Sequence, residues 1–146
     1  MTHILLVEDN QSNADLMIRL LETEGYTVKH CTHGLEGVRS VQKDPPALIL
    51  MDFNLPDVDG RTLILTLKRR TGAAQSIPII AVTARTGIME EVIAERFGCD
   101  AFVRKPFDPQ EFIAVVQQFM KKPAAPNGDS GASVGSSSGL AHPPKV

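Results

Sequence analysis

Acidic side chains follow two apolar runs of the sequence at the point where each run stops. Glu8 and Asp9 come directly after the run 4–7, and Asp52 ends the run 47–52. A short continuous apolar run is typical of a strand buried on both faces of a parallel sheet. The carboxyl ends of parallel strands lie at one edge of the sheet, where open α/β sheets bind their ligands. The sequence therefore predicts that these carboxylates meet at that edge.

Two further strand-like runs bring an alcohol and an amine to the same edge. Thr83 lies at the end of the run 77–84, and Lys105 follows the run 101–104. Acidic groups crowded together repel one another unless a cation neutralises them, and an all-oxygen ligand set suits Mg²⁺. A carboxylate beside Mg²⁺, with an ammonium and a hydroxyl in reach, is arranged to accept a phosphoryl group.

Strand and helix patterns alternate about five times along the chain, which predicts an α/β fold. The expected architecture is a doubly wound, five-stranded parallel sheet with helices on both faces and right-handed crossovers. The expected strands are 4–7, 26–31, 47–52, 77–84 and 101–104, and the expected helices run from 11 to Gly25 and over 32–43, 59–70, 90–97 and 108–122. Residues 1–122 form one domain in this interpretation, and the Pro-, Ala-, Gly- and Ser-rich segment 123–146 is expected to be a flexible tail.

Composition argues against several classes of function. The net charge of −2 and the pI of about 6.1 give no electrostatic footprint for nucleic acid or an anionic membrane. The apolar runs are too short to cross a bilayer. Two cysteines, Cys31 and Cys99, are too few for a disulfide framework, so we expect a reduced, cytoplasmic protein in which both are small buried hydrophobes. A metal site at His30 and Cys31 is disfavoured because adjacent strand residues point to opposite faces.

Taken together, these motifs resemble the receiver domain of two-component response regulators. The resemblance is carried by Leu5-Leu6-Val7-Glu8-Asp9-Asn10, Ile49-Leu50-Met51-Asp52, Leu55-Pro56-Asp57 with Gly60, Ala81-Val82-Thr83-Ala84 and Lys105-Pro106-Phe107. The resemblance covers residues 3–121, with the motifs in order at the family's spacing. Within the family, the chain is similar to DivK-like and CheY-like single-domain regulators. The family has a flavodoxin-like fold with strand order 2-1-3-4-5.

The resemblance implies a role for each residue at this edge. Asp52 would be the phosphorylated residue, and Mg²⁺ would be bound by Asp9, Asp52, the Asn54 backbone carbonyl and, through water, Glu8. Many members carry Asp where this chain has Glu8. Thr83 would turn its hydroxyl to the phosphoryl group and Phe102 would be the aromatic switch. Lys105 would bind a phosphoryl oxygen, with a cis bond to Pro106.

The function implied is a signalling switch rather than an ordinary enzyme. A histidine kinase or histidine phosphotransfer protein would donate the phosphoryl group, the protein would take part in its own phosphoryl transfer and slow autodephosphorylation, and the phosphorylated form would bind a downstream protein. No DNA-binding pattern follows Lys122, so we expect a stand-alone receiver or one excised from a longer chain, monomeric or weakly dimeric when phosphorylated.

Two other classes of function share part of this pattern. A phosphohydrolase with an Asp nucleophile would need an acid two residues after it, where this chain has Asn54. A flavin carrier of the same strand order would need a phosphate-binding loop after the first strand, whereas Glu8-Asp9-Asn10 is acidic and would repel a phosphate.

Overall fold

The computed structural model describes residues 2–70, 77–84, 92 and 95–120. One parallel sheet organises this part of the chain, with strand order β2-β1-β3-β4-β5. The strands are β1 (Ile4–Val7), β2 (Val28–Cys31), β3 (Leu48–Met51), β4 (Ile79–Thr83) and β5 (Ala101–Arg104). The order places β1 and β3, whose ends carry the carboxylates, side by side near the centre of the sheet.

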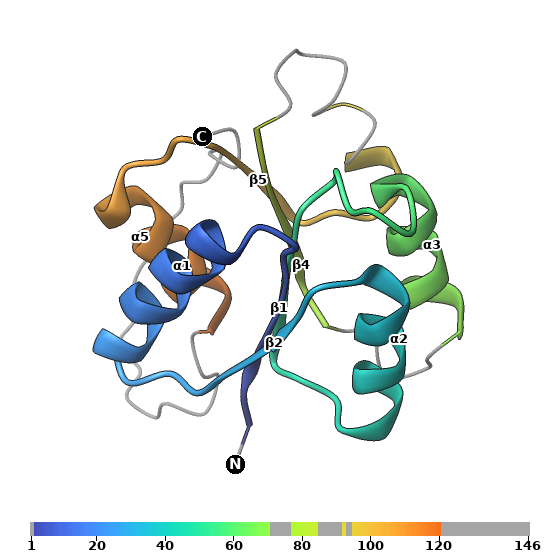
Figure 1. Ribbon diagram of the computed structural model, residues 1–146, viewed down its shortest axis with the longest axis horizontal. Coiled ribbons are helices and arrows are strands. Elements are labelled where there is room, and N and C mark those ends of the chain that lie inside the picture. The colour runs from blue at the N-terminus through green and yellow to red at the C-terminus, as the bar shows by residue number, and fades with distance from the viewer. Residues whose placement is uncertain (1, 71–76, 85–91, 93–94, 121–146) are drawn as a thin grey trace.

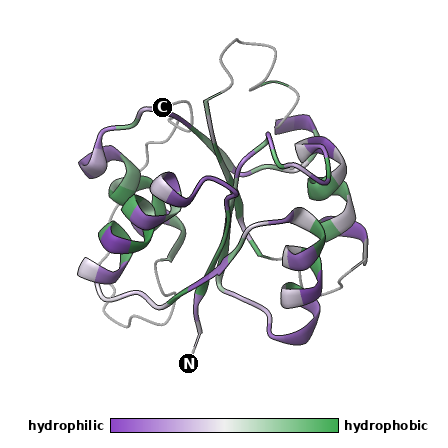
Figure 2. Cartoon of the chain, in the orientation of Figure 1, coloured by the Kyte–Doolittle hydropathy of each residue, from purple (hydrophilic) through white to green (hydrophobic). Residues whose placement is uncertain are grey.

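Helices cover both faces of this sheet. α1 (Gln11–Thr23) and α5 (Pro109–Met120) lie on one face, and α2 (Gly34–Lys43) and α3 (Gly60–Arg70) lie on the other (Figure 1). Each helix turns apolar residues toward the sheet and polar residues outward, as the hydropathy colouring shows (Figure 2). This arrangement confirms the doubly wound α/β fold predicted from the sequence.

Alternation along each strand supplies two separate cores. In β1, Ile4 and Leu6 pack toward α1 and α5, whereas Leu5 and Val7 pack toward α2 and α3. Both faces of the central strands are therefore buried, which is why their sequences read as continuous apolar runs. The two strands β1 and β3 end directly before the buried carboxylates of Glu8 and Asp52.

Local signals set the ends of α1 and of β2. The Asn10 side chain accepts a hydrogen bond from the Asn13 backbone N–H, which caps α1, and Gly25 has a φ of 93° just after that helix. The second strand begins at Val28, two residues later than the expected 26–31, and the Tyr26 N–H bonds back to the Leu21 carbonyl of α1.

A carboxylate from a distant loop caps α2. The N-cap residue, His33, makes no side-chain capping bond. Instead, the two Asp57 carboxylate oxygens accept hydrogen bonds from the Gly34 and Leu35 backbone N–H groups at 2.8 and 3.0 Å. Burial raises the pKa of Asp57, but these backbone hydrogen bonds outweigh that effect and leave the pKa below its usual value. The loop after β3 is thereby tied to α2.

Half of the predicted helix over 90–97 and all of the predicted tail over 123–146 lie outside the described residues. Among the helices that are described, none has the length and apolar character needed to cross a membrane.

Gly60→Ala is expected to destabilise the fold by about 1–3 kcal/mol. A Cβ at this position would overlap the Phe53 ring and lie 2.8 Å from the Phe53 Cα, a backbone atom that cannot turn away. Urea unfolding would measure the change. Thr62→Ala, at an exposed position in the same helical turn, should stay within about 0.5 kcal/mol of wild type, and equal stabilities for the two variants would contradict the packing.

Asp57→Ala should cost about 0.5–2 kcal/mol at pH 7, the usual range for a lost helix cap. Because the folded-state pKa of Asp57 is lowered, its contribution is complete above the unfolded pKa near 3.8 and is lost as the pH falls through the folded pKa. The difference between the unfolding free energies of wild type and variant, measured from pH 7 downward, should therefore narrow once the pH falls below about 3.8. The exposed Asp15→Ala serves as the control, and a gap that stayed constant with pH would argue against the cap.

Candidate functional site

Carboxylates from β1 and β3 meet at the carboxyl edge of the sheet. Val7 pairs with Met51 at the end of the ladder, and the Asp52 N–H continues it to the Val7 carbonyl at 3.1 Å. The residues that follow are thereby aligned, and oxygens of Glu8, Asp9 and Asp52 lie within 4.8 Å of one another. The structure thus brings together the three acids that the sequence predicted would meet.

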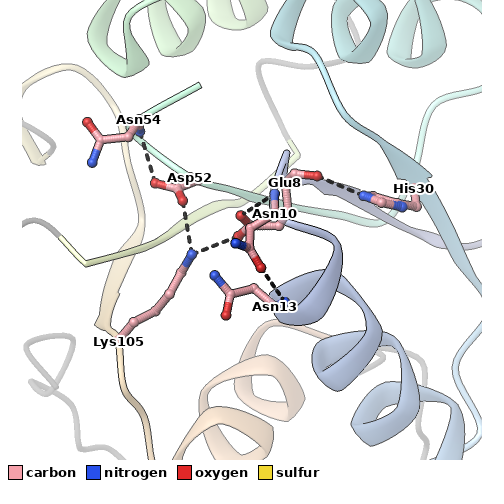
Figure 3. Close-up of polar contacts among 7 residues, drawn as sticks. All are labelled: Glu8, Asn10, Asn13, His30, Asp52, Asn54 and Lys105. Atoms are coloured by element: carbon pink, nitrogen blue, oxygen red, sulfur yellow. Dashed lines mark hydrogen bonds and ion pairs between the residues drawn. The ribbon is translucent and has the colours of Figure 1, made fainter. Parts of the chain in front are cut away.

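Lys105 completes this cluster from the other side (Figure 3). Its Nζ lies 2.8 Å from Glu8 Oε1 and 2.9 Å from Asp52 Oδ2. The side chains are largely buried, with exposed fractions of 11% for Lys105, 1% for Glu8 and 8% for Asp52. The backbone N–H of Lys105 also donates to the Thr83 carbonyl at 2.9 Å. The peptide bond between Lys105 and Pro106 is cis, as the resemblance implied.

Burial and pairing oppose each other in the pKa values of this cluster. Burial raises the pKa of Glu8, and the neighbouring Lys105 ammonium only partly offsets that effect. For Lys105, burial lowers the pKa, but the hydrogen bonds to Glu8 and Asp52 outweigh it and the net pKa is raised. Lys105 therefore carries its positive charge at neutral pH.

Backbone N–H groups fix the two buried carboxylates. The Asn10 N–H donates to Glu8 Oε2 at 3.1 Å, and the Asn54 N–H donates to Asp52 Oδ1 at 2.9 Å (Figure 3). Each carboxylate thus has one oxygen on the Lys105 ammonium and the other on the backbone. Their orientation is set before any ligand arrives.

The two residues expected to act as a switch are both inside the protein. Thr83, the last residue of β4, is fully buried, and Phe102 in β5 is 5% exposed. The Phe102 ring packs edge-on against Phe53, with the ring centroids 6.1 Å apart, on the α2 and α3 side of the sheet. Thr83 lies on β4, the strand next to β3 and Asp52, whereas Phe102 lies on β5, one strand further out.

The donor set of the cluster fits a hard divalent cation. Three carboxylates and one ammonium leave two uncompensated negative charges, and all the candidate ligand atoms are oxygens. Mg²⁺ accepts such ligands, takes one or two carboxylates and keeps several waters. Asp9 is exposed, so the site is open to solvent on one side.

One contact of the site has no signal in the sequence. His30, considered above only as a metal ligand, lies with its Nε2 2.8 Å from the Glu8 backbone carbonyl oxygen. Its neighbour Cys31 is buried on the other side of the sheet, as strand alternation predicted. The pairing of β2 with β1 brings His30 to Glu8, and that pairing is a property of the folded sheet.

Comparison with known proteins agrees with this geometry. The family model for the response regulator receiver domain matches residues 4–117. The sensory transduction protein RegX3 of Mycolicibacterium smegmatis is 32% identical over 92% of this chain and 57% of its own length. The response regulator SaeR of Staphylococcus aureus is 32% identical over 84% of this chain and 52% of its own. The chain thus spans about half the length of these curated relatives.

Solved structures give the same result. The receiver domain of a sensor histidine kinase from Pseudomonas aeruginosa, solved with a magnesium ion coordinated in its active-site cleft, is 30% identical with a TM-score of 0.76, over 83% of this chain and 98% of that one. A CheY-like receiver protein from Methanospirillum hungatei is 26% identical with a TM-score of 0.73, over 81% of this chain and 92% of that one. With its acidic cluster, paired lysine and matching strand order, the chain belongs to the response regulator receiver domain family.

Proposed function

We propose that this protein is a phospho-accepting signalling switch in which Asp52 receives a phosphoryl group in a Mg²⁺-dependent reaction. One observation supports this most directly: Asp52 and Glu8 share the Lys105 ammonium at 2.9 and 2.8 Å, beside the third carboxylate, Asp9. Phosphorelay signalling is the role of the receiver family. The assignment of the acceptor, the ligands and the switch residues in this chain is our proposal.

The transfer step needs a nucleophile and positive charge around the phosphoryl oxygens. An Asp52 carboxylate oxygen forms the new P–O bond while the P–N bond of a phosphohistidine on the donor breaks, and the bonding electrons return to the imidazole. Lys105, held 2.9 Å from Asp52 Oδ2, is placed to bind a phosphoryl oxygen. The donor is a histidine kinase or a histidine phosphotransfer protein.

Asp9, Asp52 and the Asn54 backbone carbonyl would hold the cation directly, with Glu8 bound to it through water. When bound, Mg²⁺ supplies positive charge that offsets the phosphoryl oxygens in the transition state. The Mg²⁺ in the related Pseudomonas receiver domain supports this assignment. The two negative charges left over in the cluster match the charge of the cation.

The output of the switch is a change in protein binding. Thr83 would turn its hydroxyl toward the phosphoryl group, and Phe102, on the neighbouring strand β5, would move with it, so that phosphorylation shifts a pre-existing equilibrium. A downstream protein would read the new surface, with a weak phosphorylation-dependent dimer as a further outcome. Slow autodephosphorylation would reset the switch. We place the protein in the cytoplasm, in keeping with its two unpaired, buried thiols.

The phosphohydrolase alternative finds little support in the site. The side chain two residues after Asp52 is the amide of Asn54, which cannot serve as a general acid. The Asn54 backbone N–H, moreover, is committed to the Asp52 carboxylate at 2.9 Å.

Asp52→Asn should abolish covalent labelling by acetyl phosphate in the presence of Mg²⁺, because an amide oxygen is a poor nucleophile. Intact-protein mass spectrometry would count the phosphoryl groups. The matched control is Asp59→Asn, which removes an exposed carboxylate of the same loop that pairs with Arg61. Labelling that survived in Asp52→Asn would assign the acceptor to another residue.

Asp9→Asn should weaken Mg²⁺ binding at least about tenfold, because it removes a charged ligand from a cluster of three. Isothermal titration calorimetry of Mg²⁺ into the protein would measure the dissociation constant. The exposed Asp15→Asn on α1 provides an equal change of charge away from the cluster. Equal affinities for the two variants would exclude Asp9 as a ligand.

A further inference from the structure

A histidine on the edge strand is in contact with the backbone of the acidic cluster. The His30 Nε2 lies 2.8 Å from the Glu8 carbonyl oxygen (Figure 3). His30 is paired with Leu6 in the sheet, and its ring reaches forward to Glu8, the first residue after β1. A carbonyl oxygen can only accept a hydrogen bond, so the hydrogen of this contact is on Nε2. The His30 ring is half-buried, which limits competition from water.

This contact takes the place of a backbone hydrogen bond that a longer β1–β2 ladder would make. The β1–β2 ladder ends at the pair Val7 and Cys31, and the Glu8 N–H still bonds to the Cys31 carbonyl at 3.0 Å. The Glu8 carbonyl lies beyond the last paired residue, and the His30 side chain supplies its hydrogen-bond donor. Both backbone polar groups of Glu8 are thereby held by β2.

The held peptide unit leads directly into the next ligand. The Glu8 carbonyl and the Asp9 N–H belong to one planar peptide group, so fixing the carbonyl also fixes where the Asp9 Cα lies. On the far side, the Asn10 N–H bonds to Glu8 Oε2 and the Asn10 side chain caps α1. Glu8-Asp9-Asn10 is therefore held at its start by β2 and at its end by α1.

We propose that His30 is a positioning residue for the cation site. Its Nε2–H holds the peptide between Glu8 and Asp9 so that both carboxylates face Asp52 before the cation arrives. Hydrogen bonds that hold metal ligands in place raise the affinity for the metal, because the ligands need not be ordered on binding. The inference rests on the proposed function, since it takes Mg²⁺ as the ligand of the cluster.

Three substitutions of His30 distinguish the effect of losing the hydrogen bond from the effect of losing the volume of the ring. His30→Phe keeps a flat ring of similar size but has no donor. His30→Gln places an amide nitrogen as many bonds from Cα as the His Nε2, whereas the His30→Asn amide is one bond shorter and falls short of Glu8. His33→Phe is the matched control, because His33 is exposed and contacts Thr32.

Calorimetric titration with Mg²⁺ should give a dissociation constant about 3- to 10-fold higher for His30→Phe and His30→Asn, the range for one lost hydrogen bond. His30→Gln should stay within about twofold of wild type, as should His33→Phe. In the metal-free wild-type protein, ¹⁵N NMR of the His30 ring should show the hydrogen on Nε2.

The possible results distinguish the two proposals. Wild-type affinity in His30→Phe, equal weakening in His30→Gln and His30→Phe, or a hydrogen on Nδ1 would overturn the role of His30 and leave the proposed function standing. Failure of the wild-type protein to bind Mg²⁺ would overturn both. Thermal unfolding of each variant checks that the fold is intact, so that a lower affinity reports on the site.

Discussion

The ion pairs that join Lys105 to Glu8 and Asp52 are the interactions on which the rest of the site depends. The ammonium lies 2.8 and 2.9 Å from two carboxylates that are almost fully buried. Removing one partner of a buried pair leaves an uncompensated charge and typically costs about 3–5 kcal/mol. The Lys105 ammonium therefore offsets part of the cost of burying Glu8, and it lies between two carboxylates that would otherwise repel each other.

This charge balance is incomplete, and the remaining negative charge makes the cluster suitable for a divalent cation. One ammonium cannot neutralise three carboxylates, and burial raises the pKa of Glu8 despite the pairing. A divalent cation would neutralise the remaining negative charge, which agrees with the magnesium ion found in a related receiver domain. The same positive charges would then surround a phosphoryl group on Asp52, so that binding and transfer use one set of residues.

The hydrogen bonds around the cluster come from loops that the sheet aligns. Asn10 and Asn54 hold the Glu8 and Asp52 carboxylates through their backbone N–H groups. Asp57, five residues after Asp52, caps α2 by bonds to Gly34 and Leu35. The loop that follows Asp52 is therefore tied to α2, whereas the loop that follows Glu8 is tied to β2 and α1.

The sequence by itself predicted the five strands, the burial of both faces of the central ones and the candidate site residues, because apolar runs, caps and stop signals are local. The bounds of the edge strand β2 were predicted less well, because it has no continuous apolar run. The sequence also indicated that Asp52 and Lys105 share an edge, since parallel strands all end on the same side. Only the tertiary structure decided which strands are neighbours, and so which side chains meet. The contact of His30 with Glu8 and the capping of α2 by Asp57 join residues 22 or more positions apart. Such contacts arise from strand order and loop path, which local patterns do not encode.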